Sequence, residues 1–486
     1  MIKKRPTAAL AAGMCAALLA GCASTPADVA KSEPISAAVP AGLPPGLDAQ
    51  LADPFTSTYR PLPSRPTAIV GATVLTATGL QIDDGVVVMS AGRIIAVGGP
   101  ETAIPPDATV IDARGKWVTP GLIDAHSHIG VYPSPGVDSR QDGNEMTDPN
   151  TAGVWAEHSV WPDDPAFHRA RAGGVTALHV LPGSANLFGG RSVTLKNVPS
   201  VTVRGMKFPD APHGLKMACG ENPKRVYGRK GRTPSTAMGN VYGYRKAWID
   251  AADYARKWNA YRTKVANGEK ADPPKRDLTL DTLAGVLSGE ILVQNHCYRA
   301  DEMATMIDIS REFGYRISAF HHAVEAYKIA DLLAKEGICV ATWGERGGMK
   351  MEAADGIGAN AALVHRAGGC VVIHSDDTSV IQRLNQEAAI ALEAGLRAGI
   401  PITRAEAIAW ITANPARAIG VDKHTGTLEP GKMADVVIWS RDPFSVYAVA
   451  EKVFIDGALA YDRYDSRLQP RSDFELGRPG EGAFHP

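Results

Sequence analysis

The chain has 486 residues, of which 45% are hydrophobic and 21% are charged, and its formal net charge is -1. This length and composition are typical of a globular protein with a sizeable core, built as two domains or as one large domain with an appendage. The balanced charge, without a long basic run, argues against a nucleic-acid partner.

The first residues have the pattern of an export signal. A basic stretch from Lys3 to Arg5 precedes an apolar stretch that is too short for an ordinary membrane span. This stretch ends in Leu-Ala-Gly-Cys22, which resembles the bacterial lipobox and implies cleavage before Cys22 and a lipid on that cysteine. We therefore expect an exported, periplasmic protein that meets the membrane through a lipid anchor only. Ala23 points, by the same resemblance, to the outer membrane, and a plain secretory peptide is the alternative.

Short β-rich runs occur in two groups, one near each end of the chain. The first group extends from Thr67 to Val97 and the second from Ala434 to Ile455. Gly, Asp and Ser separate the runs, as is usual between the strands of a small antiparallel sheet. We expect the two groups to form one small β-sandwich.

Strand-like and helix-like segments alternate between these two groups. Later strands are predicted to end at Val180, His296, His322, Ala341 and His374. This alternation predicts a parallel sheet, with a closed (β/α)8 barrel of the TIM type as the leading form. The expected segments are a signal peptide over 1–22, a flexible linker over 23–65, the small β-sandwich over 66–118 and 420–462, the barrel over 119–419 and a C-terminal tail over 463–486.

A polar stretch interrupts the alternation over residues 225–280. We expect it to be an insertion that covers the mouth of the barrel and is helical from Tyr244 to Lys264. Four cysteines, which are spaced without a recognisable disulfide framework and lie in or beside apolar runs, are expected to be buried free thiols: Cys219, Cys297, Cys339 and Cys370.

Several predicted strands end in residues that bind divalent metals. His126 and His128 end the first strand, and their i, i+2 spacing points both side chains to the same side. His296 and His322 end later strands, and Asp376 follows the last one. The C-terminal ends of barrel strands meet on one face, where such enzymes place their active sites. Because imidazole nitrogens and a carboxylate suit zinc or a similar divalent metal, we predict a metal site there.

Longer motifs surround these residues. They are Pro120-Gly-Leu-Ile-Asp-Ala-His-Ser-His128, Gly174-Val-Thr176, Asn295-His-Cys-Tyr-Arg-Ala-Asp301, His374-Ser-Asp376, Thr412-Ala-Asn-Pro-Ala416 and a glycine-rich stretch from Gly426 to Val437. Together they resemble the amidohydrolase superfamily, in its imidazolonepropionase-like or prolidase-like group, over about residues 67–460. The resemblance implies that His126 and His128 bind a first metal. It also implies that His296 and His322 bind or assist a second, and that Asp376 is both a metal ligand and the general base.

Two positions in this ligand set need a choice. Because successive strand residues face opposite ways, only one of His321 and His322 is expected to reach the metal. The sequence after His322 resembles the sixth-strand pattern of the family, so we choose His322 and expect His321 outside the site or behind the ligands. The bridging ligand stays open between Lys216, which is in an apolar run and would be carboxylated, and Glu221, which needs no modification.

The resemblance implies a metal-dependent amidohydrolase with one or two ions. It would cleave the carbon–nitrogen bond of a small-molecule substrate, an amide, a cyclic amide or a dipeptide, by a metal-activated water with Asp376 as the base. A deaminase or an ester or lactone hydrolase would use the same site. The alternative of another class is a non-catalytic, lipid-anchored binding protein. The sequence leaves the substrate and a homo-oligomer open.

Overall fold

The computed structural model of the protein describes residues 47–48, 53–344 and 349–469. The predicted signal peptide with Cys22, nearly all of the predicted linker up to residue 52, and the end of the predicted tail lie outside the described residues. Within the described ranges, no helix combines the length and the apolar character needed to cross a bilayer.

The two ends of the described chain share one mixed sheet of eight strands. Its order is β16-β15-β14-β5-β1-β2-β3, and β4 pairs with β1. The C-terminal strands join the N-terminal ones where β14 runs antiparallel to β5, with Val437 opposite Thr119. The bounds are β1 Thr67–Leu75, β2 Gln81–Ser90, β3 Arg93–Gly98, β4 Thr109–Asp112, β5 Trp117–Pro120, β14 Val436–Trp439, β15 Ala450–Ile455 and β16 Ala458–Asp462.

The second sheet is the TIM-type barrel, and its eight strands follow one another in chain order from β6 to β13. The barrel closes where the backbone N–H of Asp376, just beyond β13, donates to the carbonyl of His126 on β6 over 3.0 Å. The side chain of Ser375 also donates to Asp124. The bounds are β6 Leu122–Ser127, β7 Val175–Val180, β8 Phe188–Lys196, β9 Gly214–Ala218, β10 Leu292–His296, β11 Ile317–His321, β12 Cys339–Thr342 and β13 Cys370–Ile373.

One strand departs from the expected parallel arrangement. β8 runs antiparallel to both of its neighbours, β7 and β9. The connection between β7 and β8 covers only residues 181–187, whereas a parallel pair needs a crossover of a dozen or more residues. Sequence periodicity reveals a strand but not its direction, and here the short connection decides the direction.

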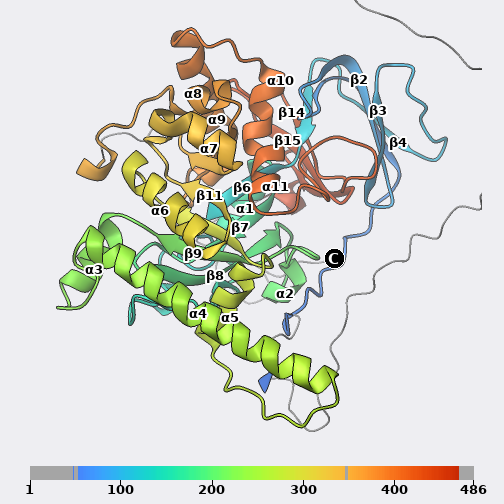
Figure 1. The fold of residues 1–486 in the computed structure, drawn as a ribbon. Helices are drawn as coiled ribbons and strands as arrows, with labels where there is room; N and C mark the ends of the chain where they lie inside the picture. Colours follow the sequence, from blue (N-terminus) through green and yellow to red (C-terminus); the bar gives the residue numbers. More distant parts are fainter. Residues whose placement is uncertain (1–46, 49–52, 345–348, 470–486) are drawn as a thin grey trace, which may run out of the picture. The chain divides into compact units, whose positions relative to one another are not determined.

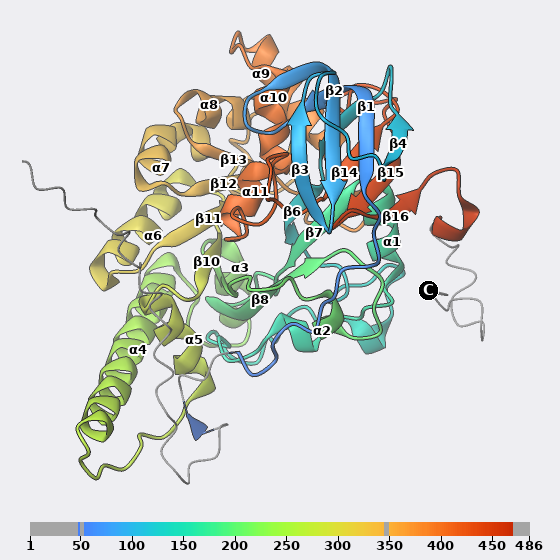
Figure 2. The ribbon, with the colours of Figure 1, turned by 90° about the vertical axis from the view of Figure 1, so that its right-hand side faces the viewer.

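Helices surround the barrel, as Figures 1 and 2 show. Helix α6 illustrates why they form: it has Asp301 and Glu302 in its first turn, ends at Gly314 in the left-handed conformation, and buries Met303, Met306 and Ile307 at helical spacing. The other helices are α1 Pro165–Ala172, α2 Val203–Met206, α3 Glu221–Gly228, α5 Leu278–Leu287, α7 Ala330–Glu336, α8 Asn360–Arg366, α9 Leu384–Arg397, α10 Arg404–Ala407 and α11 Ala413–Ala418, and α6 itself spans Ala300–Phe313.

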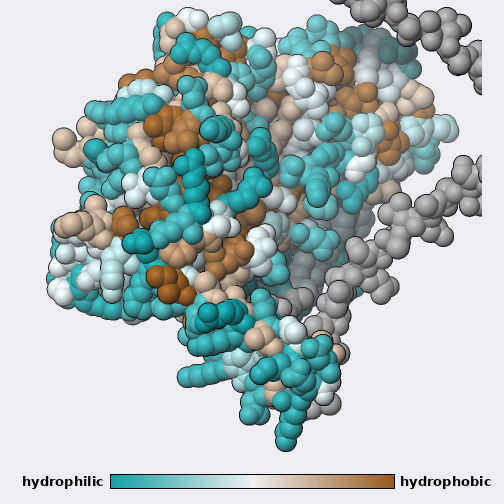
Figure 3. All heavy atoms as spheres, in the orientation of Figure 1, coloured by the Kyte–Doolittle hydropathy of each residue, from teal (hydrophilic) through white to brown (hydrophobic). Residues whose placement is uncertain are grey.

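Most of the expected insertion forms the long helix α4, Ala237–Ala266. The Tyr244 hydroxyl donates to the carbonyl of Ala218, the last residue of β9. Three turns later, Tyr254 and Trp258 line a cavity beside His213, just before β9 begins. Helix α4 therefore follows β9 from its C-terminal end toward its N-terminal end. In Figure 1 the end of this helix forms the lower projection of the molecule, and in the same view of Figure 3 the surface of that projection is mostly hydrophilic.

The four cysteines form two disulfides, Cys219–Cys297 and Cys339–Cys370. The expectation of free thiols is therefore wrong. Cys339 and Cys370 lie opposite each other on β12 and β13, and the other pair directly follows β9 and β10. Their pairing depends on which strands are neighbours, and that information is absent from sequence spacing alone.

Candidate metal centre

Three of the predicted ligands meet between the first and last strands of the barrel. The side chains of His126 and His128 approach each other, with 3.3 Å between their Nε2 atoms. The Asp376 Oδ1 lies 3.1 Å from His128 Nε2 and 3.5 Å from His126 Nε2. One ligand atom from each of these side chains therefore points toward a common position, as a divalent cation requires.

The electrostatics favour metal-binding protonation states at His126 and Asp376. Burial lowers the pKa of His126 well below its usual value, and nearby Lys216 lowers it further, so the ring is neutral. Burial would raise the pKa of Asp376, but the hydrogen bond with His128 and the nearby His374 and Lys216 together lower it overall. A neutral imidazole and an ionised carboxylate are the forms that coordinate a metal.

Lys216 on β9 joins the trio from the opposite wall. Its Nζ lies 3.3 Å from His126 Nε2, and its side chain is almost fully buried. Burial lowers its pKa from 10.5 to about 7, although Asp376 opposes this shift. No carboxylate in the described residues forms an ion pair with it. A positive charge on this buried amine would need an anion, and none of the described side chains forms an ion pair with it.

His296 and His322 form the second half of the cluster. Their ring centroids are 4.8 Å apart, and the His322 Nε2 lies 3.9 Å from Asp376 Oδ2. The Nδ1 atom of each is buried and has no hydrogen-bond partner among the described residues. An unsatisfied buried polar atom costs about 1–3 kcal/mol, and a coordinated cation would remove that cost. The residues present therefore fit a divalent metal.

Backbone conformation explains why His321 and His322 both turn inward. His322 has φ 60°, in the left-handed region that residues other than glycine rarely adopt. This turn breaks the strand alternation directly after β11. Its ring contacts His126 and His296, while His321 places its Nδ1 2.8 Å from His126 Nδ1, behind the ring. Asp376 has φ 56°, so two of the predicted ligands have the rare conformation that often marks functional sites.

The structure does not bring Glu221 to these histidines in any described contact. Glu221 begins helix α3, and its carboxylate lies 3.3 Å from the Nζ of Lys350. Its backbone N–H donates to Glu352 over 2.8 Å. Of the two candidates for a bridging ligand, the geometry places only Lys216 beside a predicted ligand.

The walls of the site contain residues that the sequence did not single out. The carbonyl of Leu181, after β7, lies 2.8 Å from His128 Nδ1 and orients that ring. The Trp343 ring stacks on His322, with centroids 4.6 Å apart. Gln294 lies 2.7 Å from His321 Nε2. Of these three, only Gln294 had a usable signal: it is two residues before His296 on the same strand, so both side chains face inward.

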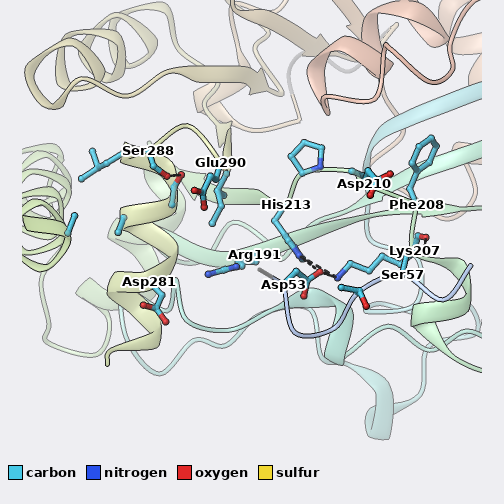
Figure 4. Close-up of a pocket in the computed structure, with 18 of the residues that line it drawn as sticks. Asp53, Ser57, Arg191, Lys207, Phe208, Asp210, His213, Asp281, Ser288 and Glu290 are labelled. Atoms are coloured by element: carbon cyan, nitrogen blue, oxygen red, sulfur yellow. Dashed lines mark hydrogen bonds and ion pairs between the residues drawn. The ribbon is translucent and has the colours of Figure 1, made fainter. Parts of the chain in front are cut away.

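A separate polar cluster borders a cavity of about 640 Å3 (Figure 4). This cavity lies at the N-terminal ends of β9 and β10, whereas the metal-ligand candidates lie at the C-terminal ends of the strands. Asp53, Glu157 and His213 each place a potential ligand atom within 4.8 Å of the others there. The ammonium of Lys207 already lies 2.5 Å from a carboxylate oxygen of both Asp53 and Glu157. These charges satisfy one another, and residues at this end of a barrel usually serve stability.

Comparisons with known proteins agree with this geometry. The model of the Amidohydrolase family matches residues 117–460. Amidohydrolase tasK of Hapsidospora irregularis is 33% identical over 402 residues, which are 78% of this chain but only 40% of that longer relative. An imidazolonepropionase of Rhizobium meliloti (strain 1021) is 23% identical over 397 residues, 74% of this chain and 86% of that protein. The crystal structure of an amidohydrolase from Thermotoga maritima MSB8 is 35% identical, with a TM-score of 0.75 over 82% of this chain and 100% of that one.

Proposed function

This chain belongs to the amidohydrolase family, and on that premise we propose that it is a hydrolase of carbon–nitrogen bonds, which cleaves an amide, cyclic amide or dipeptide with the help of bound divalent metal. The observation that carries the proposal is the meeting of His126, His128, Lys216 and Asp376, whose polar atoms lie 3.1–3.5 Å apart. Imidazole and carboxylate ligands favour zinc.

We further propose two ions, bridged by a carboxylated Lys216. His126, His128 and Asp376 would hold one ion, and His296 and His322 would hold the other. The lowered pKa of Lys216, about 7, leaves a substantial fraction of its amine neutral near neutral pH. A neutral amine can add to carbon dioxide, which forms a carbamate and releases one proton. The carbamate oxygens would then supply the negative charge that two cations require.

The side chains around the ions have separate tasks. A bound divalent ion would supply a water of strongly lowered pKa and would polarise the carbonyl under attack. Asp376, kept ionised by His128, would accept the proton of the attacking water on a carboxylate oxygen and deliver it to the leaving nitrogen. Leu181 fixes the ring of His128, and the Trp343 ring limits the movement of His322.

The test pairs two neighbouring carboxylates. Asp376→Asn should lower metal-dependent hydrolysis of a panel of dipeptides and cyclic amides by about 10²–10⁴-fold. The matched control is Asp377→Asn, because Asp377 accepts hydrogen bonds from the backbone of Ser379 and Val380 outside the cluster. Equal activity of wild type and Asp376→Asn would contradict the mechanism. Hydrolysis of esters or lactones alone, or release of ammonia alone, would favour the rival enzymes, and no turnover with any class would favour a binding protein.

We also propose that the enzyme is exported and lipid-anchored at Cys22. Two disulfides in the barrel support an oxidising compartment, since such bonds are rare in the reducing cytosol. Mass spectrometry of the mature protein should find a lipidated N-terminal Cys22. A mature chain that begins elsewhere would remove this part of the proposal.

A further inference from the structure

A continuous chain of hydrogen bonds runs from a backbone carbonyl to His126. The Gln294 Nε2 donates to the carbonyl of Ala418 over 2.8 Å. The Gln294 Oε1 lies 2.7 Å from His321 Nε2, and His321 Nδ1 lies 2.8 Å from His126 Nδ1. Gln294, His321 and His126 are fully buried, so water does not compete for these bonds.

The carbonyl of Ala418 sets the donor and acceptor of every hydrogen bond in this series. A carbonyl can only accept, so the amide of Gln294 must turn its NH2 group toward Ala418 and its oxygen toward His321. The His321 Nε2 must then carry a proton and donate it. In neutral His321 the Nδ1 is left as an acceptor, and His126 must donate from its own Nδ1. The lone pair of His126 Nε2 therefore points toward Lys216, His128 and Asp376.

Two other arrangements are unfavourable. Rotating the Gln294 amide by 180° would place its oxygen 2.8 Å from the carbonyl oxygen of Ala418, with no proton between them. Protonating His321 on both nitrogens would bury a cation that forms no ion pair with any carboxylate of the described residues. An uncompensated buried charge is expensive. Both alternatives cost more than the single arrangement in which each donor meets an acceptor.

We propose that Gln294 and His321 are positioning residues that lock His126 in the tautomer whose Nε2 is free to bind a metal. The proposal rests on the proposed metal-dependent function for its purpose, whereas the tautomer itself is a property of the metal-free protein. Without the lock, the His126 ring would divide between two tautomers, and one of them would direct an N–H bond at the ion. Loss of such an outer hydrogen bond typically weakens metal binding by about 10–100-fold.

The test removes the hydrogen bonds of Gln294 and leaves the neighbouring residues unchanged. Gln294→Met keeps the length of the side chain but neither donates to Ala418 nor offers His321 a carbonyl oxygen. The matched control is Ser318→Ala, because the Ser318 hydroxyl donates to the same Ala418 carbonyl over 2.6 Å without touching His321. His321→Phe is a second variant, which breaks the chain at its next bond should Gln294→Met fold poorly.

Two readouts separate this inference from the proposed function. Two-bond proton–nitrogen spectra of metal-free protein labelled at histidine should show His126 protonated at Nδ1 in wild type and Ser318→Ala, and a tautomer mixture in Gln294→Met and His321→Phe. Competition with a chelator should show zinc bound about 10–100-fold more weakly in the last two variants. An unchanged tautomer and unchanged affinity in both would overturn the lock. Wild type that binds no zinc would contradict the metal-dependent function, and the spectra would still decide the tautomer.

Discussion

Two lysines on neighbouring strands of the barrel are equally buried but have opposite surroundings. Lys196 ends β8 and Lys216 lies on the adjacent β9, and both are exposed by 1% or less. The Nζ of Lys196 lies 2.9 Å from Asp435 and 3.1 Å from Asp456. Lys216 has no carboxylate partner in the described residues, and its hydrogen-bonding neighbour is His126. Burial alone therefore does not distinguish a structural lysine from a functional one.

The surroundings of Lys196 are complete. Asp435 also accepts from the Thr425 hydroxyl over 2.7 Å, and Asp456 accepts from the Tyr59 hydroxyl. This cluster joins the barrel to the small sheet, because Asp435 directly precedes β14 and Asp456 directly follows β15. Both carboxylates accept hydrogen bonds from Lys196 and from a hydroxyl group, so the cluster requires no ligand. Lys216, by contrast, would gain an anionic partner only from a ligand or a modification.

Removing Lys196 should have the largest effect on stability. Lys196→Met would leave two buried carboxylates without their cation, and breaking such a pair typically costs about 3–5 kcal/mol. Denaturant titrations should show this loss equally with and without zinc, since the Nζ of Lys196 bonds to Met433, Asp435 and Asp456 and to none of the predicted metal ligands. A loss below about 1 kcal/mol would mean that the two carboxylates take up protons when Lys196 is absent. The contrast drawn between Lys196 and Lys216 would then be wrong. Adding Asp456→Asn should recover part of the stability by removing one of the stranded charges.

The same substitution at Lys216 should have the opposite sign. In the metal-free protein, Lys216→Met replaces a poorly paired buried amine by an apolar side chain of similar length, and we expect a gain of about 1–3 kcal/mol. Binding of the second ion should be lost, which elemental analysis would show as a fall in the metal-to-protein ratio. Destabilisation of the metal-free protein would show instead that Lys216 has a structural role like that of Lys196.

The sequence predicted the strand ends that carry His126, His128 and His296 because strand periodicity and the position of ligands in a barrel are local patterns. It left Lys216 and Glu221 open, since only the fold shows that Glu221 pairs with Lys350 while Lys216 meets His126. The left-handed turn at His322 had no signal either, because the residue is not glycine. Such features depend on contacts between distant strands, as do the direction of β8 and the disulfides.

The last prediction is a pH dependence of stability that originates at Lys216. Burial lowers the pKa of Lys216 from 10.5 to about 7. Between these values the unfolded chain binds a proton on this lysine that the folded, metal-free protein does not, so stability rises as pH increases. One group contributes at most about 1.4 kcal/mol per pH unit.

Denaturation of metal-free wild type and Lys216→Met at several pH values from 7 to 10 measures this difference. All other titrating groups are common to the two proteins, so their contributions cancel. We expect the stability advantage of Lys216→Met at pH 7 to shrink steadily toward pH 10, because the proton that the wild-type amine gives up on folding becomes easier to release as the pH approaches 10.5. Parallel curves would mean that Lys216 keeps its proton in the folded state. A charged Lys216 would then need an anion beside it, and the two lysines would differ only in where that anion comes from.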